Sequence, residues 1–247
     1  MGMLDKAGVT RRMCPVIFLL DTSGSMAGSP IGAVNAAMEG VLPELISMND
    51  ENTDAEINVA VLSFDTAAKW VTNGLVDPGN FGWNDLNPGG GTSMGAAFKE
   101  LDTALSVSKG FMNRASGSVA PVLFLLSDGG PTDSYKEHLQ KLQNNNWYKV
   151  AARVAIGYGS NSNDAILAEF TGNTETVLHT NDPKDLKNMI RFVTITSSMV
   201  ASKGSAVAVQ DNNANAPADP NDATSKLVQE FKKNPPTLAT DDEDDDW

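Results

Sequence analysis

Only one cysteine, Cys14, and two histidines occur among the 247 residues. A single cysteine cannot form an internal disulfide. Its place just before an apolar run indicates a small core residue rather than a nucleophile. The two histidines, His138 and His179, follow no pattern with a nucleophile, which argues against a hydrolytic triad and favours exposed or structural roles. This composition fits a reducing compartment, and we expect a cytoplasmic protein.

Basic residues and long apolar runs are also scarce. Lys and Arg total 18 against 31 Asp and Glu, which gives a formal net charge of −13 at pH 7. Without a Lys/Arg-rich stretch, we expect no nucleic-acid partner. The apolar run that follows Arg12 stops at Asp21, too early for a signal sequence or a membrane span. We therefore expect no membrane partner.

Two apolar runs, residues 16–20 and 121–126, each end in a polar turn that contains glycine, which is typical of strands buried on both faces. Helical spacing follows the first run, from Pro30 with Ser29 as its cap, and Pro43 predicts a kink or an early end. We expect further strands over 57–64, 67–71, 150–158 and 176–178, and further helices over 94–107, 132–142, 164–170 and 184–199. This alternation predicts an α/β fold, a doubly wound and mostly parallel sheet with helices on both faces.

The chain divides by composition into three parts. Residues 1–12 form a polar N-terminal lead-in, and residues 13–202 form the folded domain. Residues 203–247 are expected to be a disordered acidic tail, in which residues 225–232 make one weak turn or two of helix. Ten acidic and three basic residues lie between Asp211 and Trp247, so this part carries −7 of the net charge of −13. The tail either keeps the protein solvated or offers its carboxylates to a metal site.

Small oxygen donors gather at predicted strand ends. Asp21, Ser23 and Ser25 end the first strand, Thr92 follows the glycines 89–91, and Asp128 ends the 121–126 run. The carboxyl ends of parallel strands share one edge of a sheet, where ligands bind. Two carboxylates and three hydroxyls suit a hard cation such as Mg²⁺ or Mn²⁺, which keeps several waters. A carboxylate from a partner can replace one of these waters.

These segments, Asp21-Thr22-Ser23-Gly24-Ser25, Thr92 after glycines and Ser127-Asp128-Gly129, resemble the metal-ion-dependent adhesion site of the von Willebrand factor A family. The resemblance covers about residues 13–200, and none of the five donor positions departs from the pattern. It implies that Ser23, Ser25 and Thr92 ligate the metal directly or nearly so. Asp21 and Asp128 are then expected to act largely through water or as outer anchors.

Within that family, the runs FLLDTSGSMAGSPIGAVNAAMEGVL, VAVLSFDTAAKWV and GGGTSMGAAFKEL resemble the bacterial tellurium-resistance TerY type. This resemblance implies a cytoplasmic bacterial protein of a stress or metal-resistance system. Its partners are expected to be kinase- or phosphatase-like proteins.

The functional hypothesis is a non-enzymatic, metal-dependent protein-interaction module whose partner offers an Asp or Glu carboxylate. Two alternatives stay open: a metal-dependent phosphatase that uses the same cation, and a structural subunit of an ATPase- or chelatase-linked complex. Phe81 and Trp83, on the long loop 73–91, either anchor a partner or fold under the loop. Met26 either faces a partner or packs on the first helix.

Overall fold

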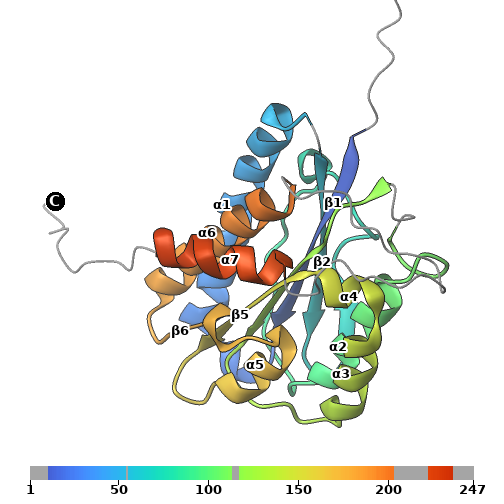
Figure 1. The fold of residues 1–247 in the computed structure, drawn as a ribbon. Coiled ribbons are helices and arrows are strands. Elements are labelled where there is room, and N and C mark those ends of the chain that lie inside the picture. Colours follow the sequence, from blue (N-terminus) through green and yellow to red (C-terminus); the bar gives the residue numbers. More distant parts are fainter. Residues whose placement is uncertain (1–10, 54, 113–116, 203–221, 236–247) are drawn as a thin grey trace, which may run out of the picture.

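The computed structural model describes residues 11–53, 55–112, 117–202 and 222–235. Six strands form one sheet in the order β3-β2-β1-β4-β5-β6, and helices cover both of its faces (Figure 1). The strands are β1 (Arg12–Asp21), β2 (Ala55–Phe64), β3 (Ala68–Trp70), β4 (Val122–Ser127), β5 (Ala152–Tyr158) and β6 (Val177–Thr180). The α-helices are α1 (Ser29–Glu51), α2 (Met94–Ala104), α3 (Tyr135–Asn144), α4 (Asn146–Val150), α5 (Asp164–Thr171), α6 (Pro183–Ser202) and α7 (Asp222–Lys233).

All neighbouring strands run parallel except the edge strand β3, which pairs antiparallel with β2. The two central strands, β1 and β4, are apolar along nearly their whole length and buried. Parallel strands of this kind need cover on both faces, which the helices that connect them supply. The structure confirms the predicted α/β, mostly parallel, doubly wound fold.

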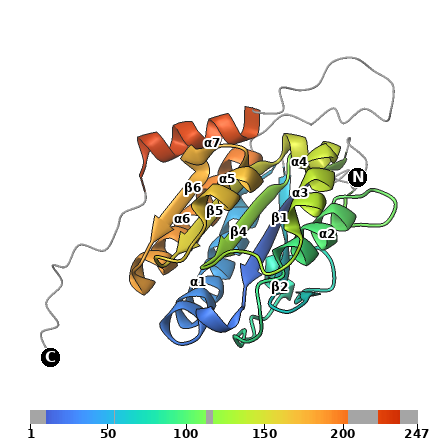
Figure 2. The same cartoon turned by 90° about the horizontal axis from the view of Figure 1, so that it is seen from below.

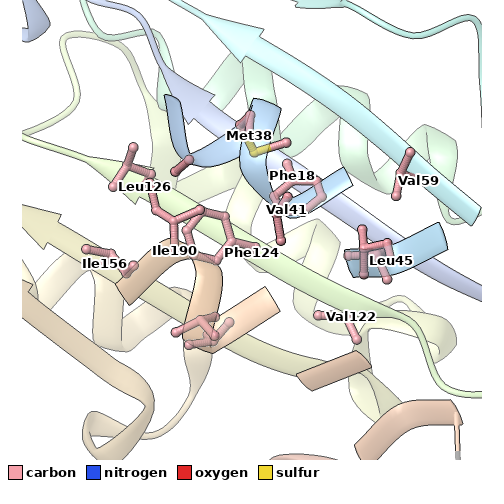
Figure 3. Close-up of a cluster of buried hydrophobic side chains, with 14 of the residues drawn as sticks. Phe18, Met38, Val41, Leu45, Val59, Val122, Phe124, Leu126, Ile156 and Ile190 are labelled. Carbon is pink, nitrogen blue, oxygen red and sulfur yellow. The ribbon is translucent and has the colours of Figure 1, made fainter. Parts of the chain in front are cut away.

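The side chains of β1 alternate between two hydrophobic cores. Phe18 and its neighbours two positions away face the core built with α1 and α6, whereas Ile17 and Leu19 face the core built with α2 and α5. In the first core, the rings of Phe18 and Phe124 meet edge to face with centroids 5.6 Å apart (Figure 3). Packing on both faces holds β1 and β4 in register, and so fixes the positions of their carboxyl ends.

Helix α1 differs from its prediction at both ends. It begins at Ser29 with Gly28 as the N-cap, at φ 87°, so the predicted cap is wrong. The left-handed backbone of Gly28 is one that other residues rarely adopt. The helix also continues through Pro43 to Glu51, because residues on both sides of the proline, such as Leu42 and Leu45, are buried against the sheet. Tertiary packing outweighs the missing backbone hydrogen bond.

Other element boundaries also differ from the predictions. Helix α2 ends at Ala104, and Val107, predicted to be its last residue, is 50% exposed. The helix predicted from Thr132 begins at Tyr135. The short helix α4 was not predicted; it occupies Val150, so β5 begins two residues later than expected. The Asn145 side chain starts α4 by accepting hydrogen bonds from two of its backbone N–H groups.

Helix α7 forms inside the segment predicted to be disordered, and it lies beside α6 (Figures 1 and 2). Leu227 and Phe231 are buried, and the rings of Phe231 and Phe192 have centroids 5.2 Å apart. The Thr224 hydroxyl donates to the carbonyl of Ala151 over 3.2 Å. The weak turn or two of helix predicted over 225–232 is thus a longer helix, and the prediction of a disordered tail does not hold for these residues, because their apolar stripe packs against the core. The remaining tail residues lie outside the described residues, as do residues 1–10 of the lead-in.

Within the described ranges, no helix has both the length and the apolar character needed to cross a membrane.

Candidate metal centre

The candidate site lies where β1 and β4 end side by side. These strands are parallel neighbours with Leu20 opposite Leu126, so Asp21 follows in line with Ser127. Asp21 and Ser127 are fully buried, and Asp128 is 7% exposed. The sheet thus brings two carboxylates from distant parts of the sequence to one edge.

A chain of hydrogen bonds links four of the five predicted donors. Asp21 Oδ1 accepts from the backbone N–H of Ser23 at 2.8 Å, and Asp21 Oδ2 accepts from the Ser127 hydroxyl at 2.5 Å. The hydroxyl oxygens of Ser23 and Ser25 are 3.0 Å apart, and the Ser25 hydroxyl donates to Asp128 Oδ1 at 2.8 Å. The structure therefore places Asp21, Ser23, Ser25 and Asp128 in one cluster of oxygens.

The fifth predicted donor, Thr92, lies on the adjoining loop before α2. Two backbone hydrogen bonds join that loop to the β1 loop: Gly24 N–H to the Gly90 carbonyl at 3.1 Å, and Gly89 N–H to the Thr22 carbonyl at 2.8 Å. Thr92 is only 6% exposed, and among the described residues its hydroxyl has no hydrogen-bond partner. A bound cation would give this hydroxyl a partner.

The electrostatics of the cluster also fit a cation. Burial raises the pKa of Asp21 to about 6, although hydrogen bonds from Ser127 and Ser23 act in the opposite direction. Burial also raises the pKa of Asp128. Within the described part of the chain, neither carboxylate forms an ion pair with Lys, Arg or His. Two buried carboxylates and three hydroxyls without a positive partner match the oxygen donors that Mg²⁺ and Mn²⁺ take.

The glycines before Thr92 allow the loops to approach closely. Gly90 has φ 73°, and a Cβ there would lie 2.2 Å from Thr66 Oγ1. The same Thr66 oxygen accepts from Gly91 N–H at 3.3 Å, and Ser93 N–H donates to the Asp65 carbonyl at 2.7 Å. The turn between β2 and β3 therefore supports the Thr92 loop from one side. A larger residue at position 90 would clash with Thr66 and displace this contact.

Sequence reasoning missed three polar residues of this region. Ser127 binds Asp21, and its position at the end of the apolar strand was the signal that could have revealed it. Thr132 and Asp133 were predicted to open a helix. Instead they contact Thr92 and the first turn of α2. Nothing in their sequence spacing distinguishes a cap on the following helix from a cap on a neighbouring one.

The other candidates have structural roles. Met26 is fully buried. Phe81 and Trp83 meet edge to face and are partly buried against the core that contains α1. Both residues therefore pack under the loop rather than stand free on its surface. Asn35 holds this loop through two hydrogen bonds to the backbone of Leu86.

The two histidines form no catalytic relay among the described residues. His179 Nδ1 lies 3.0 Å from Asp164 Oδ2, but the Ser162 hydroxyl donates to Asp164 rather than to the histidine. His138 is half-buried on α3.

In the described part of the chain, no group of three His, Cys, Asp or Glu residues is placed to hold a metal. The oxygen cluster relies on hydroxyls, which such a group does not include.

Comparison with known proteins identifies one domain type. The sequence model of the von Willebrand factor type A domain matches residues 16–192. A search of curated protein sequences found no match.

Solved structures share the fold at low sequence identity. Proximal thread matrix protein 1 from the mussel byssus, in a structure with a zinc-occupied metal-ion-dependent adhesion site motif, is 18% identical with a TM-score of 0.56, and 74% of this chain aligns with 48% of that one. A von Willebrand factor type A protein from Catenulispora acidiphila is 20% identical (TM-score 0.55; 76% and 43% covered). The ArnB paralog VWA2 from Sulfolobus acidocaldarius is 17% identical (TM-score 0.53; 73% and 45% covered). The chain spans about half the length of these proteins.

Proposed function

The chain belongs to the von Willebrand factor type A domain family, whose domains serve protein interaction and adhesion, and we propose that it is a non-enzymatic module that binds a partner protein through a divalent cation. The partner contributes an Asp or Glu carboxylate. The cation is Mg²⁺ or Mn²⁺, and the proposed ligand set is Asp21, Ser23, Ser25, Thr92 and Asp128.

Each residue of the set has a distinct task in this proposal. The hydroxyls of Ser23, Ser25 and Thr92 face the cation as neutral donors. Asp21 orients the β1 loop through the Ser23 N–H, and Asp128 orients the Ser25 hydroxyl. When bound, the cation supplies a Lewis-acid position for the partner's carboxylate. Neutral donors leave it with unbalanced positive charge, so an anionic ligand is favoured.

The observation that carries the proposal is the pair of buried carboxylates, Asp21 and Asp128, which lie in one hydrogen-bonded cluster with Ser23 and Ser25 and have no cationic partner among the described residues. The loops that hold the five residues, 21–28, 89–93 and 127–133, contain no His, Lys, Arg or Cys. These loops therefore offer no imidazole or thiol to a phosphatase, and the carboxylates of Asp21 and Asp128 already accept hydrogen bonds from serine groups of the cluster. The composition of these loops supports binding over catalysis.

We further propose that the protein works in the cytoplasm of a bacterium, in a tellurium-resistance or related stress system, with a kinase- or phosphatase-like partner. Three sequence runs that resemble the TerY type support this assignment. A deletion strain challenged with tellurite tests it. We expect sensitivity that wild-type protein reverses and the Thr92→Val variant does not. Growth of the deletion strain equal to that of the wild-type strain in the presence of tellurite would exclude this role.

Calorimetric titration of Mg²⁺ and Mn²⁺ into chelator-treated full-length protein tests the site. We expect saturable binding at one site, lost in Asp21→Ala and strongly weakened in Thr92→Val. The matched control is Ser118→Ala, which removes a buried, unpartnered hydroxyl at the opposite end of β1. This control should bind as wild type does. Absence of binding by the wild-type protein would refute the proposed site.

Capture of proteins from a cell extract on immobilised full-length protein tests the interaction. A specific partner should elute with chelator and fail to bind the Thr92→Val variant. Replacing one exposed Asp or Glu of that partner by Asn or Gln should abolish the complex. Cation-dependent turnover of p-nitrophenyl phosphate, lost in Asp21→Ala, would instead identify an enzyme. A complex that survives chelator would favour a structural subunit.

A further inference from the structure

We propose that Thr132 and Asp133, on the loop between β4 and α3, are positioning residues that hold Thr92 in place for cation binding. The inference rests on the proposed role of Thr92 as a cation ligand. It adds two residues that contact no cation themselves and act through Thr92. It also joins two of the loops that form the site into one unit.

Thr132 engages both backbone polar groups of Thr92. The Thr92 N–H donates to Thr132 Oγ1 at 3.0 Å, and the Thr132 N–H donates to the Thr92 carbonyl at 2.9 Å. These reciprocal bonds join residues 40 positions apart in sequence. They fix the peptide planes on both sides of Thr92. Because a β-branched side chain has few χ1 rotamers, a fixed backbone also restricts where the Thr92 hydroxyl lies.

Asp133 fixes the start of α2, which begins two residues after Thr92. Its carboxylate oxygens accept from the N–H groups of Gly95 and Ala96 at 2.9 and 3.0 Å. The residue in the N-cap position, Ser93, makes no capping bond, because its hydroxyl donates to the Thr66 carbonyl. Helix α2 is therefore capped by a residue of another loop. The negative charge of Asp133 at the N-terminus of α2 also stabilises the helix.

Two glycines mark the same contact. A Cβ on Gly91 would lie 3.0 Å from Thr132 Oγ1. A Cβ on Gly95 would lie 2.9 Å from both Asp133 Oδ2 and the Tyr135 Cα. The two segments therefore approach closely on both sides of Thr92, and the chain has glycine at both points of contact.

The loop between β4 and α3, which positions Thr92 through Thr132, also contains Asp128, four residues before Thr132. A displacement of this loop would therefore move a carboxylate and a hydroxyl of the site together. We expect the affinity for the cation to depend on Thr132 and Asp133, although neither belongs to the proposed ligand set. Substitution of residues that orient metal ligands lowers metal affinity by roughly 10- to 100-fold.

The test uses full-length protein with Thr132→Val, which keeps the shape and loses the acceptor, Thr132→Ser, which keeps the acceptor, and Asp133→Ala. Calorimetric Mn²⁺ affinity should fall about 10- to 100-fold in Thr132→Val and Asp133→Ala. Thr132→Ser should restore it to near wild type. The matched control is Asn145→Ala, which removes a comparable side-chain cap from α4 and a bond to Asp102 near the C-terminal end of α2, away from Thr92. It should lower stability and leave the Mn²⁺ affinity unchanged.

A second measurement needs no metal. In metal-free protein, the amide hydrogens of Thr92, Gly95 and Ala96 should exchange faster in Thr132→Val and Asp133→Ala than in wild type and Asn145→Ala. Mn²⁺ affinities within twofold of wild type in both variants would overturn the inference and leave the proposed site standing. An equal loss in Asn145→Ala would overturn it as well. No Mn²⁺ binding by wild-type protein would remove the proposed function, and this inference with it.

Discussion

The Ser25 hydroxyl donates a 2.8 Å hydrogen bond to Asp128 Oδ1, although the two residues are 103 positions apart. Each stands just beyond a central strand, Ser25 after β1 and Asp128 after β4. The bond therefore exists only when these two strands pair in their parallel register. The oxygen cluster is a property of the sheet, and its chemistry follows from the burial that the sheet imposes.

Cation affinity should depend on pH through Asp21. Burial raises its pKa to about 6 in the metal-free protein, and a cation requires the ionised form. Protons therefore compete with the cation below about pH 6, where we expect the Mn²⁺ affinity to fall by up to about tenfold per pH unit. Calorimetry between pH 5 and 7.5 measures this. A flat profile would contradict the raised pKa, and the slope should be smaller in Asp21→Asn.

The metal-free protein should become more stable when Asp21 loses its charge. A carboxyl pKa raised from 3.8 to about 6 favours folding below pH 3.8, and this contribution is lost as the pH rises through about 6. Asp21→Asn should therefore raise the free energy of unfolding at pH 7.5, by as much as about 3 kcal/mol. Urea unfolding in chelator measures it. The difference should vanish near pH 3.5, and a destabilised variant at pH 7.5 would contradict the prediction.

Gly90 and Gly89 should respond differently to alanine. At Gly90, φ is 73° and a Cβ would lie 2.2 Å from Thr66 Oγ1, whereas a Cβ on Gly89 meets nothing within 4 Å. Gly90→Ala should lower stability by about 1 kcal/mol or more and weaken Mn²⁺ binding, because the Thr92 loop must shift. Gly89→Ala is the control. Thermal unfolding and calorimetry compare the two, and equal behaviour would argue against the tight loop contact.

Helix α7 should contribute to the stability of the whole domain. Phe231 is 7% exposed and packs on Phe192 of α6. Phe231→Ala in the full-length chain should cost about 3 kcal/mol of unfolding free energy. Lys233→Ala, on the exposed side of the same helix, should change it by less than about 0.5 kcal/mol. Urea unfolding measures both. Equal small effects would mean that α7 does not stay docked in solution.

Cys14 should be chemically inert in the folded protein. Complete burial raises the pKa of its thiol to about 12, so almost no thiolate exists at neutral pH. A thiol reagent such as dithionitrobenzoate should react with it only after unfolding in guanidinium chloride. Rapid reaction of the native protein at pH 8 would contradict the buried position at the start of β1.

The sheet could be predicted because its signals are local. The apolar runs that form β1 and β4 are followed by Asp21 and by Ser127-Asp128. The carboxyl ends of parallel strands lie at one edge of a sheet, so both carboxylates were expected there. Thr92, at the start of a predicted helix, was expected at the same edge of the sheet, although its contacts were not known. For this reason the residues of the proposed ligand set could be named in advance, although the hydrogen bonds among them could not.

The features that escaped prediction depend on contacts between distant segments. Asp133 caps α2 rather than α3, and Pro43 is tolerated because its helix is pressed against the sheet. Helix α7 has a polar sequence with a narrow apolar stripe. That stripe is buried because it packs against α6, a contact that the sequence does not reveal. Local propensity contains none of this information.

The bond between Ser127 and Asp21, which spans 106 positions, has a consequence for the lifetime of the protein. The unfolded chain cannot assemble these oxygens, so a cation that occupies them binds only the native state. At a free concentration 100 times its dissociation constant, such a cation would add about 2.7 kcal/mol to the free energy of unfolding. Proteases that attack unfolded chains would then degrade the protein faster when the cation is scarce, so its abundance would follow the supply of the metal.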